Sequence, residues 1–169
     1  MTDKVFIDSN VWCYFFLQDE EEKYIMAEKF FSNKENDTIF VISYQVINEV
    51  TNKLIQKHFD SATIKENIDY MYKICTVQNF TKDIIILAFQ LREKYSFSFW
   101  DSVIVASALY SNCNILASED MQNGLKINNM VKTFLPNHNS PHKPAQTALL
   151  WHISERMAAC RQACGCGLS

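Results

Sequence analysis

Four carboxylates stand at positions from which a folded chain could bring them together for metal chemistry: Asp8, Glu49, Asp101 and Asp120. Two carboxylates about 4 Å apart repel each other by roughly 4 kcal/mol at an effective dielectric constant of 20. Several of them at one place therefore need protonation or a cation, and a hard divalent ion such as Mg²⁺ or Mn²⁺ matches oxygen ligands. One or two such ions could activate water and stabilise the charge that develops during hydrolysis of a phosphodiester bond.

The elements that must position these acids alternate between strands and helices. Strands are predicted where short apolar runs rich in β-branched residues occur. Helices are predicted where apolar residues recur three and four positions apart. The predicted strands are residues 4–8, 39–43, 74–77, 115–118 and 130–135, and the predicted helices are residues 10–17, 21–31, 44–58, 61–72, 81–95 and 99–111. This alternation predicts a three-layer α/β/α fold with a four- to five-stranded parallel sheet.

The predicted topology places the four acids at one edge of the sheet. Ligands of open parallel sheets bind outside the carboxyl ends of the strands, and Asp8 and Asp120 follow two of those ends. Glu49 lies two turns into the helix after the second strand. Asp101 starts a helix that feeds the fourth strand and runs antiparallel to it, so the start of that helix belongs to the same edge.

Each acid also has an ordinary structural interpretation. Asp8 could cap the next helix, and Asp101 could complete a capping box with Ser98. Glu49 could be a solvated helix residue, and Asp120 a turn residue. Two patterns favour the functional interpretation. Glu49 lies beside the apolar stripe of its helix rather than opposite it, and the helix around Asp101 is apolar almost all round, which predicts burial.

Four segments carry these acids along the chain: VFIDSNV at 5–11, SYQVINEV at 43–50, FWDSVIVASAL at 99–109 and ILASEDMQNG at 115–124. Together, over roughly residues 4–136, they resemble the PIN-domain ribonucleases, and in particular the VapC-like toxins of bacterial toxin–antitoxin pairs. The resemblance implies a metal-dependent endoribonuclease, the toxin of such a pair, that hydrolyses RNA phosphodiester bonds. It also implies a cognate antitoxin and a homodimer as partners.

The resemblance assigns the same four acids as catalytic residues and ligands of one or two Mg²⁺ or Mn²⁺ ions. We expect Asp8 and Asp101 to be the principal ligands, and Glu49 and Asp120 to complete the shell directly or through water. Three polar residues have supporting roles in this interpretation. Asn10 and Ser118 occupy positions where the family often has a polar residue near the metals, and Glu119, next to Asp120, could exchange roles with it.

The chain divides at Pro136 into a predicted nuclease domain, residues 1–136, and an atypical C-terminal segment, residues 137–169. Residues 137–144 are polar and contain two prolines, which is typical of a linker. Residues 145–164 could form one helix. The histidines and cysteines of this segment invite a zinc interpretation, but their spacing does not match a recognised pairing around a compact loop.

Composition sets bounds on the surroundings of the protein and on its mode of RNA binding. No apolar run approaches the ~20 residues that span a bilayer, and the N-terminus lacks the features of a signal peptide. We therefore expect a cytoplasmic protein, without membrane association and with free thiols. The formal net charge of −3 speaks against RNA binding through bulk electrostatics, so contacts should be local. Candidate contacts are Lys53, Lys57, Lys94 and Lys126, whereas Met26, Phe30, Phe31 and Trp100 are expected in the core.

Other function classes also gather acids at strand ends. A phosphotransferase of the haloacid-dehalogenase pattern would require an aspartate at position 10, where this chain has Asn10. The receiver-domain pattern would require an acid after the third strand, where residues 76–79 read TVQN. The remaining alternative is a catalytically weak PIN-like module that binds nucleic acid or protein, and retention of all four acids weighs against it.

Overall fold

The computed structural model describes residues 3–32, 38–119, 126–127 and 131–133. In chain order, its elements are β1 (Lys4–Ile7), α1 (Ser9–Leu17), α2 (Glu21–Ser32), β2 (Ile39–Ser43), α3 (Tyr44–Gln56), α4 (Ser61–Ile74), β3 (Cys75–Gln78), α5 (Lys82–Tyr95), α6 (Phe99–Tyr110), β4 (Ile115–Ala117), β5 (Lys126–Ile127) and β6 (Val131–Thr133). The predicted alternation of strands and helices is confirmed over this part of the chain.

The strands form one sheet in the order β3-β2-β1-β4-β6-β5. All neighbouring pairs are parallel except β5 with β6. The predicted α/β fold with a parallel sheet is therefore confirmed, and β6 corresponds to the strand predicted within residues 130–135. The antiparallel strand β5 was not predicted, because two residues are too few to show an alternating pattern.

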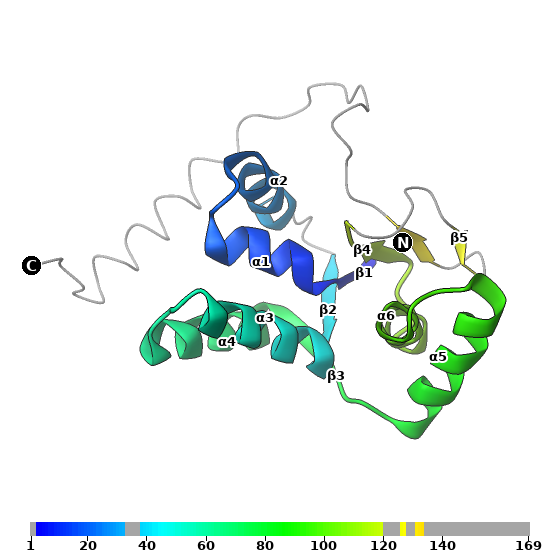
Figure 1. The fold of residues 1–169 in the computed structure, drawn as a ribbon. Coiled ribbons are helices and arrows are strands. Elements are labelled where there is room, and N and C mark those ends of the chain that lie inside the picture. Colours follow the sequence, from blue (N-terminus) through cyan, green and yellow to red (C-terminus); the bar gives the residue numbers. More distant parts are fainter. Residues whose placement is uncertain (1–2, 33–37, 120–125, 128–130, 134–169) are drawn as a thin grey trace, which may run out of the picture.

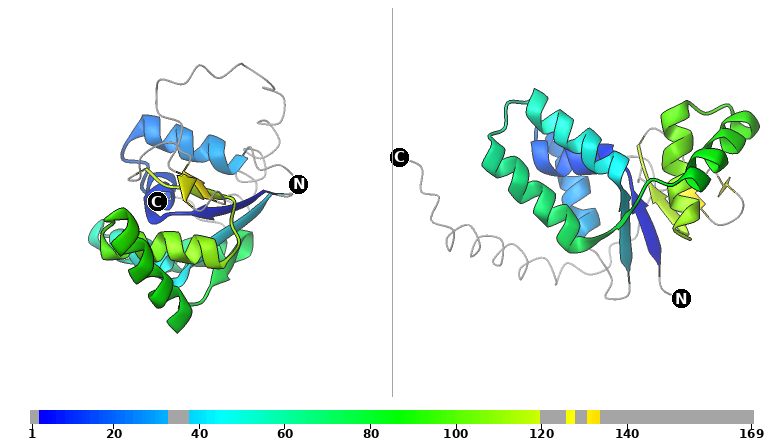
Figure 2. Two further views of the ribbon diagram at one scale, coloured as in Figure 1. Left: turned by 90° about the vertical axis from the view of Figure 1, so that its right-hand side faces the viewer. Right: turned by 90° about the horizontal axis from the view of Figure 1, so that it is seen from below.

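Helices cover both faces of the sheet, as the three-layer prediction requires. Helices α1 to α4 lie on one side of the strands, and α5 and α6 form a hairpin on the other side (Figure 1 and the right-hand view of Figure 2). The chain moves from β1 outward to β2 and β3, then crosses back through α5 and α6 to β4 on the other side of β1. The strand order therefore reverses between β1 and β4, and such a switch point is where open α/β sheets bind ligands.

The central strands are buried on both faces, which is why their sequences are continuous apolar runs. Phe6, Ile7 and Ile42 are fully buried, and Trp12 of α1 is buried against them in the same core. Residues 102–109 of α6 are also all buried, which confirms the burial predicted for the helix around Asp101. None of the described helices is long and apolar enough to cross a membrane.

Side-chain caps start the helices close to their predicted positions. Ser43 Oγ accepts a hydrogen bond from the backbone N–H of Val46 at the start of α3 (3.3 Å), and Thr81 caps α5 in the same way. Helix α3 ends at Gln56, two residues before the predicted end. His58 adopts a left-handed conformation (φ 61°), which cannot continue a right-handed helix.

One expectation about the core is wrong. Trp100 is 59% exposed, whereas Met26, Phe30 and Phe31 are half-buried. Phe99, the neighbour of Trp100, packs against the core, so the error concerns Trp100 itself, whose exposure the apolar composition of α6 does not reveal.

Candidate active site

Asp8 follows β1 and is buried, with 8% of its surface exposed. Its Oδ1 accepts a hydrogen bond from the backbone N–H of Ser9 (2.7 Å), so Asp8 caps α1 as its ordinary interpretation predicts. Its Oδ2 accepts a second hydrogen bond from Ser118 Oγ (2.7 Å). A buried carboxylate needs such donors, because burial without them is costly. The two hydrogen bonds fix the orientation of the Asp8 carboxylate.

Ser118, a predicted supporting residue, is fully buried just after β4. Its hydrogen bond to Asp8 joins residues 110 positions apart. Beside it, the backbone N–H of Asp8 donates to the carbonyl oxygen of Ala117 (2.9 Å). The predicted meeting of the segments around residues 8 and 118 is therefore present, at the switch point between β1 and β4. Asn10 lies half-buried in the first turn of α1.

Glu49 is half-buried on α3, and its Oε1 accepts a hydrogen bond from Gln45 Nε2 (2.8 Å), one helical turn away. Only the amide nitrogen of Gln45 can donate to a carboxylate, so the orientation of the amide is settled. Gln45 Oε1 is buried and accepts no hydrogen bond from the described residues. A buried amide oxygen of this kind calls for a water molecule or another donor beside Glu49.

Cys13, on α1, lies close to both Asp8 and Glu49. The pKa of its thiol is raised to about 11, first by burial and then by the negative charges of Glu49, Asp8 and Asp19, while the positive charge of Lys53 lowers it. The thiol is therefore protonated at neutral pH, so Cys13 does not supply a thiolate nucleophile. The negative charges of Asp8 and Glu49 therefore both act on this thiol, together with that of Asp19.

Asp101 lies in the first turn of α6 and is half-buried. Ser98 Oγ accepts a hydrogen bond from the backbone N–H of Asp101 (3.1 Å) and donates one to Asp101 Oδ2 (2.6 Å). Ser98 thus caps α6, whereas the Asp101 carboxylate accepts from the Ser98 hydroxyl rather than from its backbone N–H, so only half of the capping box is formed. A carboxylate has about four acceptor sites, and Asp101 Oδ1 accepts no hydrogen bond within the described part of the chain.

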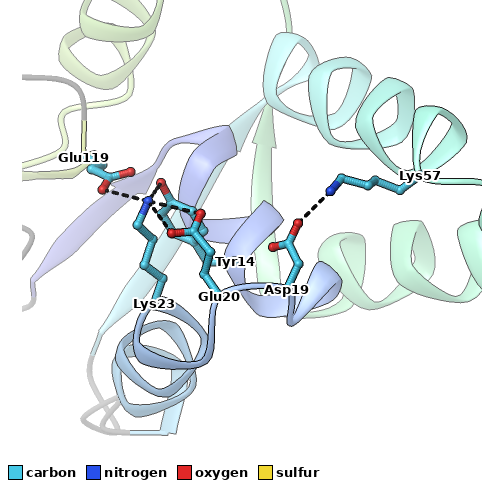
Figure 3. A network of polar contacts seen from close by, with 6 residues as sticks. All are labelled: Tyr14, Asp19, Glu20, Lys23, Lys57 and Glu119. Carbon is cyan, nitrogen blue, oxygen red and sulfur yellow. Dashed lines mark hydrogen bonds and ion pairs between the residues drawn. The ribbon is translucent and has the colours of Figure 1, made fainter.

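The fourth predicted acid, Asp120, lies outside the described residues. Its neighbour Glu119 forms an ion pair with Lys23 of α2 (Oε1 to Nζ, 3.4 Å). Lys23 also pairs with Glu20 (3.0 Å) and donates to the Tyr14 hydroxyl (3.2 Å), so one ammonium group joins α1, α2 and the second residue after β4 (Figure 3). Sequence analysis missed Lys23, because only its spacing to Glu20 is visible without the fold.

The predicted lysine contacts differ in their surroundings. Lys53 is exposed one turn after Glu49, and its charge reaches Cys13, so it borders the site. Lys57 is paired with Asp19 (2.8 Å; Figure 3). Lys94 lies 5.1 Å from the centre of the Tyr95 ring. The side chain of Lys126 lies outside the part of the chain that the structure describes.

Among the described residues, no three Asp, Glu, His or Cys side chains gather closely enough to hold a metal ion. The structure brings Asp8 and Glu49 near one thiol, while Asp101 hydrogen-bonds to its own helix cap. The donor chemistry nevertheless suits Mg²⁺ or Mn²⁺, because the side chains offer carboxylate oxygens. A hydrogen bond from Ser118 orients Asp8, and one from Gln45 orients Glu49. Carboxylates that bind metal ions are commonly oriented by such hydrogen bonds.

Comparison with known proteins identifies the fold and the family. The family model of the PIN domain matches residues 5–123, a range that contains all four predicted acids. No curated protein matches the sequence significantly.

Three solved structures share the fold. A toxin from Mycobacterium tuberculosis that cleaves the sarcin-ricin loop is 16% identical, with a TM-score of 0.56 over 66% of this chain and 86% of its own. A toxin–antitoxin complex from Klebsiella pneumoniae is 16% identical, with a TM-score of 0.58 over 79% of this chain and 98% of its own. A VapBC complex from Rickettsia felis, bound to promoter DNA, is 15% identical, with a TM-score of 0.56 over 78% and 98%.

These low identities establish similarity of fold alone. The family model, which matches most of the chain, establishes the family. The buried Asp8 at the switch point of a parallel sheet lies inside the matched range. This chain belongs to the PIN-domain family.

Proposed function

We propose that this protein is a Mg²⁺- or Mn²⁺-dependent endoribonuclease, the toxin of a toxin–antitoxin pair. The observation that carries the proposal is the buried Asp8 carboxylate, which Ser9 and Ser118 hold in place at the switch point of the sheet. Membership of the PIN-domain family supports it. Several similar structures are toxin–antitoxin assemblies, which supports a cognate antitoxin as a partner and a cytoplasmic setting. A homodimer is proposed with it.

In this proposal, Asp8 and Asp101 are the principal metal ligands, and Glu49 and Asp120 complete the shell. When bound, a divalent ion supplies Lewis-acid stabilisation of phosphate charge and activation of water. The chain's own groups then have separate tasks.

Ser118 holds the Asp8 carboxylate, and Gln45 holds that of Glu49. Asn10 lines the site in this proposal. Glu119, paired with Lys23, supports the segment that leads to Asp120. The exposed Lys53 offers a positive charge to an RNA phosphate beside Glu49.

The substitution Asp101→Asn tests the proposal, and Asp83→Asn is its matched control. Both aspartates lie in the first turn of a helix, where removal of a negative charge costs about 0.3–1 kcal/mol of stability. Cleavage of single-stranded RNA in millimolar Mn²⁺ should fall at least 100-fold for Asp101→Asn, equivalent to about 2.7 kcal/mol of lost transition-state stabilisation. It should stay within about twofold of the wild type for Asp83→Asn, the factor that a loss of ~0.4 kcal/mol would give.

Melting curves of both variants establish that they fold. Near-normal cleavage by Asp101→Asn would leave Asp101 only its capping role and contradict the proposed site. A wild-type protein that Mn²⁺ stabilises, but that does not cleave RNA, would instead support the catalytically weak binding module.

A further inference from the structure

Trp100 has the largest exposed fraction among the large hydrophobic side chains described, at 59%. It directly precedes Asp101 in the first turn of α6. The rest of that helix, residues 102–109, is buried. An indole left in water forgoes a large gain in hydrophobic free energy, so its exposure beside a proposed metal ligand calls for an explanation in terms of binding.

One neighbouring ring contacts this tryptophan, and a second ring packs on the first. The Phe99 ring lies 5.1 Å from the indole, centre to centre, in an edge-on arrangement. Phe89 of α5 packs on Phe99 at 5.7 Å and is itself 51% exposed. We call Phe89, Phe99 and Trp100 the aromatic surface. Two helices build it, so its rings are supported before any ligand arrives and lose less conformational entropy on binding.

A positive charge adjoins the aromatic surface. Arg92 follows Phe89 by three residues on α5, a spacing that places two side chains side by side on a helix. Arg92 is exposed and forms no ion pair within the described ranges. A guanidinium group binds phosphate in two-pronged fashion, so the combination of ring and guanidinium suits a nucleotide better than a purely apolar partner.

We propose that Trp100 stacks on a base of the RNA substrate, one nucleotide from the phosphate that is cleaved. The inference rests on the proposed function, because a phosphate at Asp101 brings an adjacent base within reach of the preceding residue, Trp100. Single-stranded RNA offers unstacked bases to aromatic side chains. Stacking also gives affinity that does not depend on bulk electrostatic attraction, which a chain with a formal net charge of −3 does not offer to RNA.

The experiment compares Trp100→Ala and Trp100→Phe with Tyr110→Ala in the full chain. Tyr110 ends the same helix and is 44% exposed, so it controls for loss of an exposed ring far from Asp101. The substrates are a single-stranded RNA whose cleavage position has been mapped and the same RNA with an abasic nucleotide next to that position. We measure kcat and KM in Mn²⁺ at low and high salt, and the mass of each variant by light scattering.

Trp100→Ala should lower kcat/KM on the intact RNA by about 5- to 150-fold, the range found for loss of one stacked base, mainly through KM. Trp100→Phe should keep most of the activity, and Tyr110→Ala should match the wild type. The loss should shrink on the abasic RNA and persist at high salt, because stacking does not depend on phosphate charge. A merely structural role would lower activity equally on both substrates.

Three results would overturn the inference. Unchanged kcat/KM for Trp100→Ala in an active enzyme would refute it and leave the proposed function standing. Unchanged RNA kinetics with a loss of dimer mass would assign the aromatic surface to protein contact. Absence of metal-dependent cleavage by the wild type would refute the proposed function itself, and the inference with it.

Discussion

Ser118→Ala removes the buried hydroxyl that donates to Asp8 Oδ2 at 2.7 Å. Ser118 is fully buried and Asp8 is 8% exposed, so water hardly replaces the lost donor. Taking away one partner of a buried hydrogen bond costs about 1–3 kcal/mol. For a chain of this size, each 1 kcal/mol corresponds to about 2–4 °C, so the melting temperature of the metal-free protein should fall by roughly 2–12 °C.

The chain contains a matched control for this change. Ser107 of α6 is also fully buried, but its hydroxyl has no hydrogen-bond partner within the described residues. Ser107→Ala deletes the same atom and leaves no donor or acceptor newly unpaired, so we expect a change within about 0.5 kcal/mol or a small gain in stability. The assay is urea unfolding of both variants in EDTA, followed by a Mn²⁺ titration of their melting temperatures.

Two results would contradict this role of Ser118. Equal free energies of unfolding for the two alanine variants would show that the Asp8 carboxylate does not depend on Ser118. A double-mutant cycle gives the second check: in an Asp8→Ala background, Ser118→Ala should lose most of its cost, and a coupling energy below about 0.5 kcal/mol would mean that the two side chains act independently.

Two further predictions concern charges around α1. The pKa of Asp19 is lowered by its hydrogen bond from Lys57, so Asp19→Asn should destabilise the protein at pH 7. The difference should shrink as the pH falls below the ordinary aspartate value of about 3.9 and vanish only below the lowered pKa of Asp19 in the folded protein; a pH-independent difference in urea midpoints would contradict this. Alkylation of Cys13 at pH 8 in EDTA should be on the order of 100-fold slower than for an ordinary thiol, because the pKa of Cys13 is about 11. The substitution Glu49→Gln should speed this alkylation, because it removes a negative charge that raises the pKa of Cys13. An unchanged alkylation rate, measured by peptide mass spectrometry, would show that Glu49 does not act on the Cys13 thiol.

Periodicity predicted the elements well, and local chemistry explains the small errors. The helix from Tyr44 was predicted to reach residue 58 and ends at Gln56, because His58 takes a left-handed conformation. A left-handed residue does not change the spacing of the apolar residues, so the apolar pattern could not predict it. Strand β5 was missed since its two residues are too few to show an alternating pattern, although Ile127 is buried in the core.

The candidate site was predictable only in part. The position of Asp8 beside Ser118 follows from parallel pairing of β1 with β4. The alternation of elements implies a parallel sheet but not its strand order, so this contact was not predicted. The hydrogen bond from Gln45 to Glu49 has the spacing of helix neighbours and could have been found. The contact of Lys23 with Glu119 could not, because it depends on how α2 packs near the end of β4. The exposure of Trp100 could not be read from the apolar pattern of α6, because its neighbour Phe99 packs against the core while Trp100 does not.

The hydrogen bond that links residues 8 and 118 also has a consequence for the order in which the chain folds. Helices α1 and α2 and the first strand pairs can form from nearby chain, whereas β1 meets β4 only after a loop of about a hundred residues closes, and such long-range pairings are slow to form. During synthesis, Asp8 emerges early, and Ser118 emerges only when most of the described chain has been made. A ribosome-bound chain that stops before β4 would hold Asp8 without its partner, so the site cannot be completed on a truncated product. For an enzyme proposed to cut RNA, this delay separates translation of the chain from the onset of its activity.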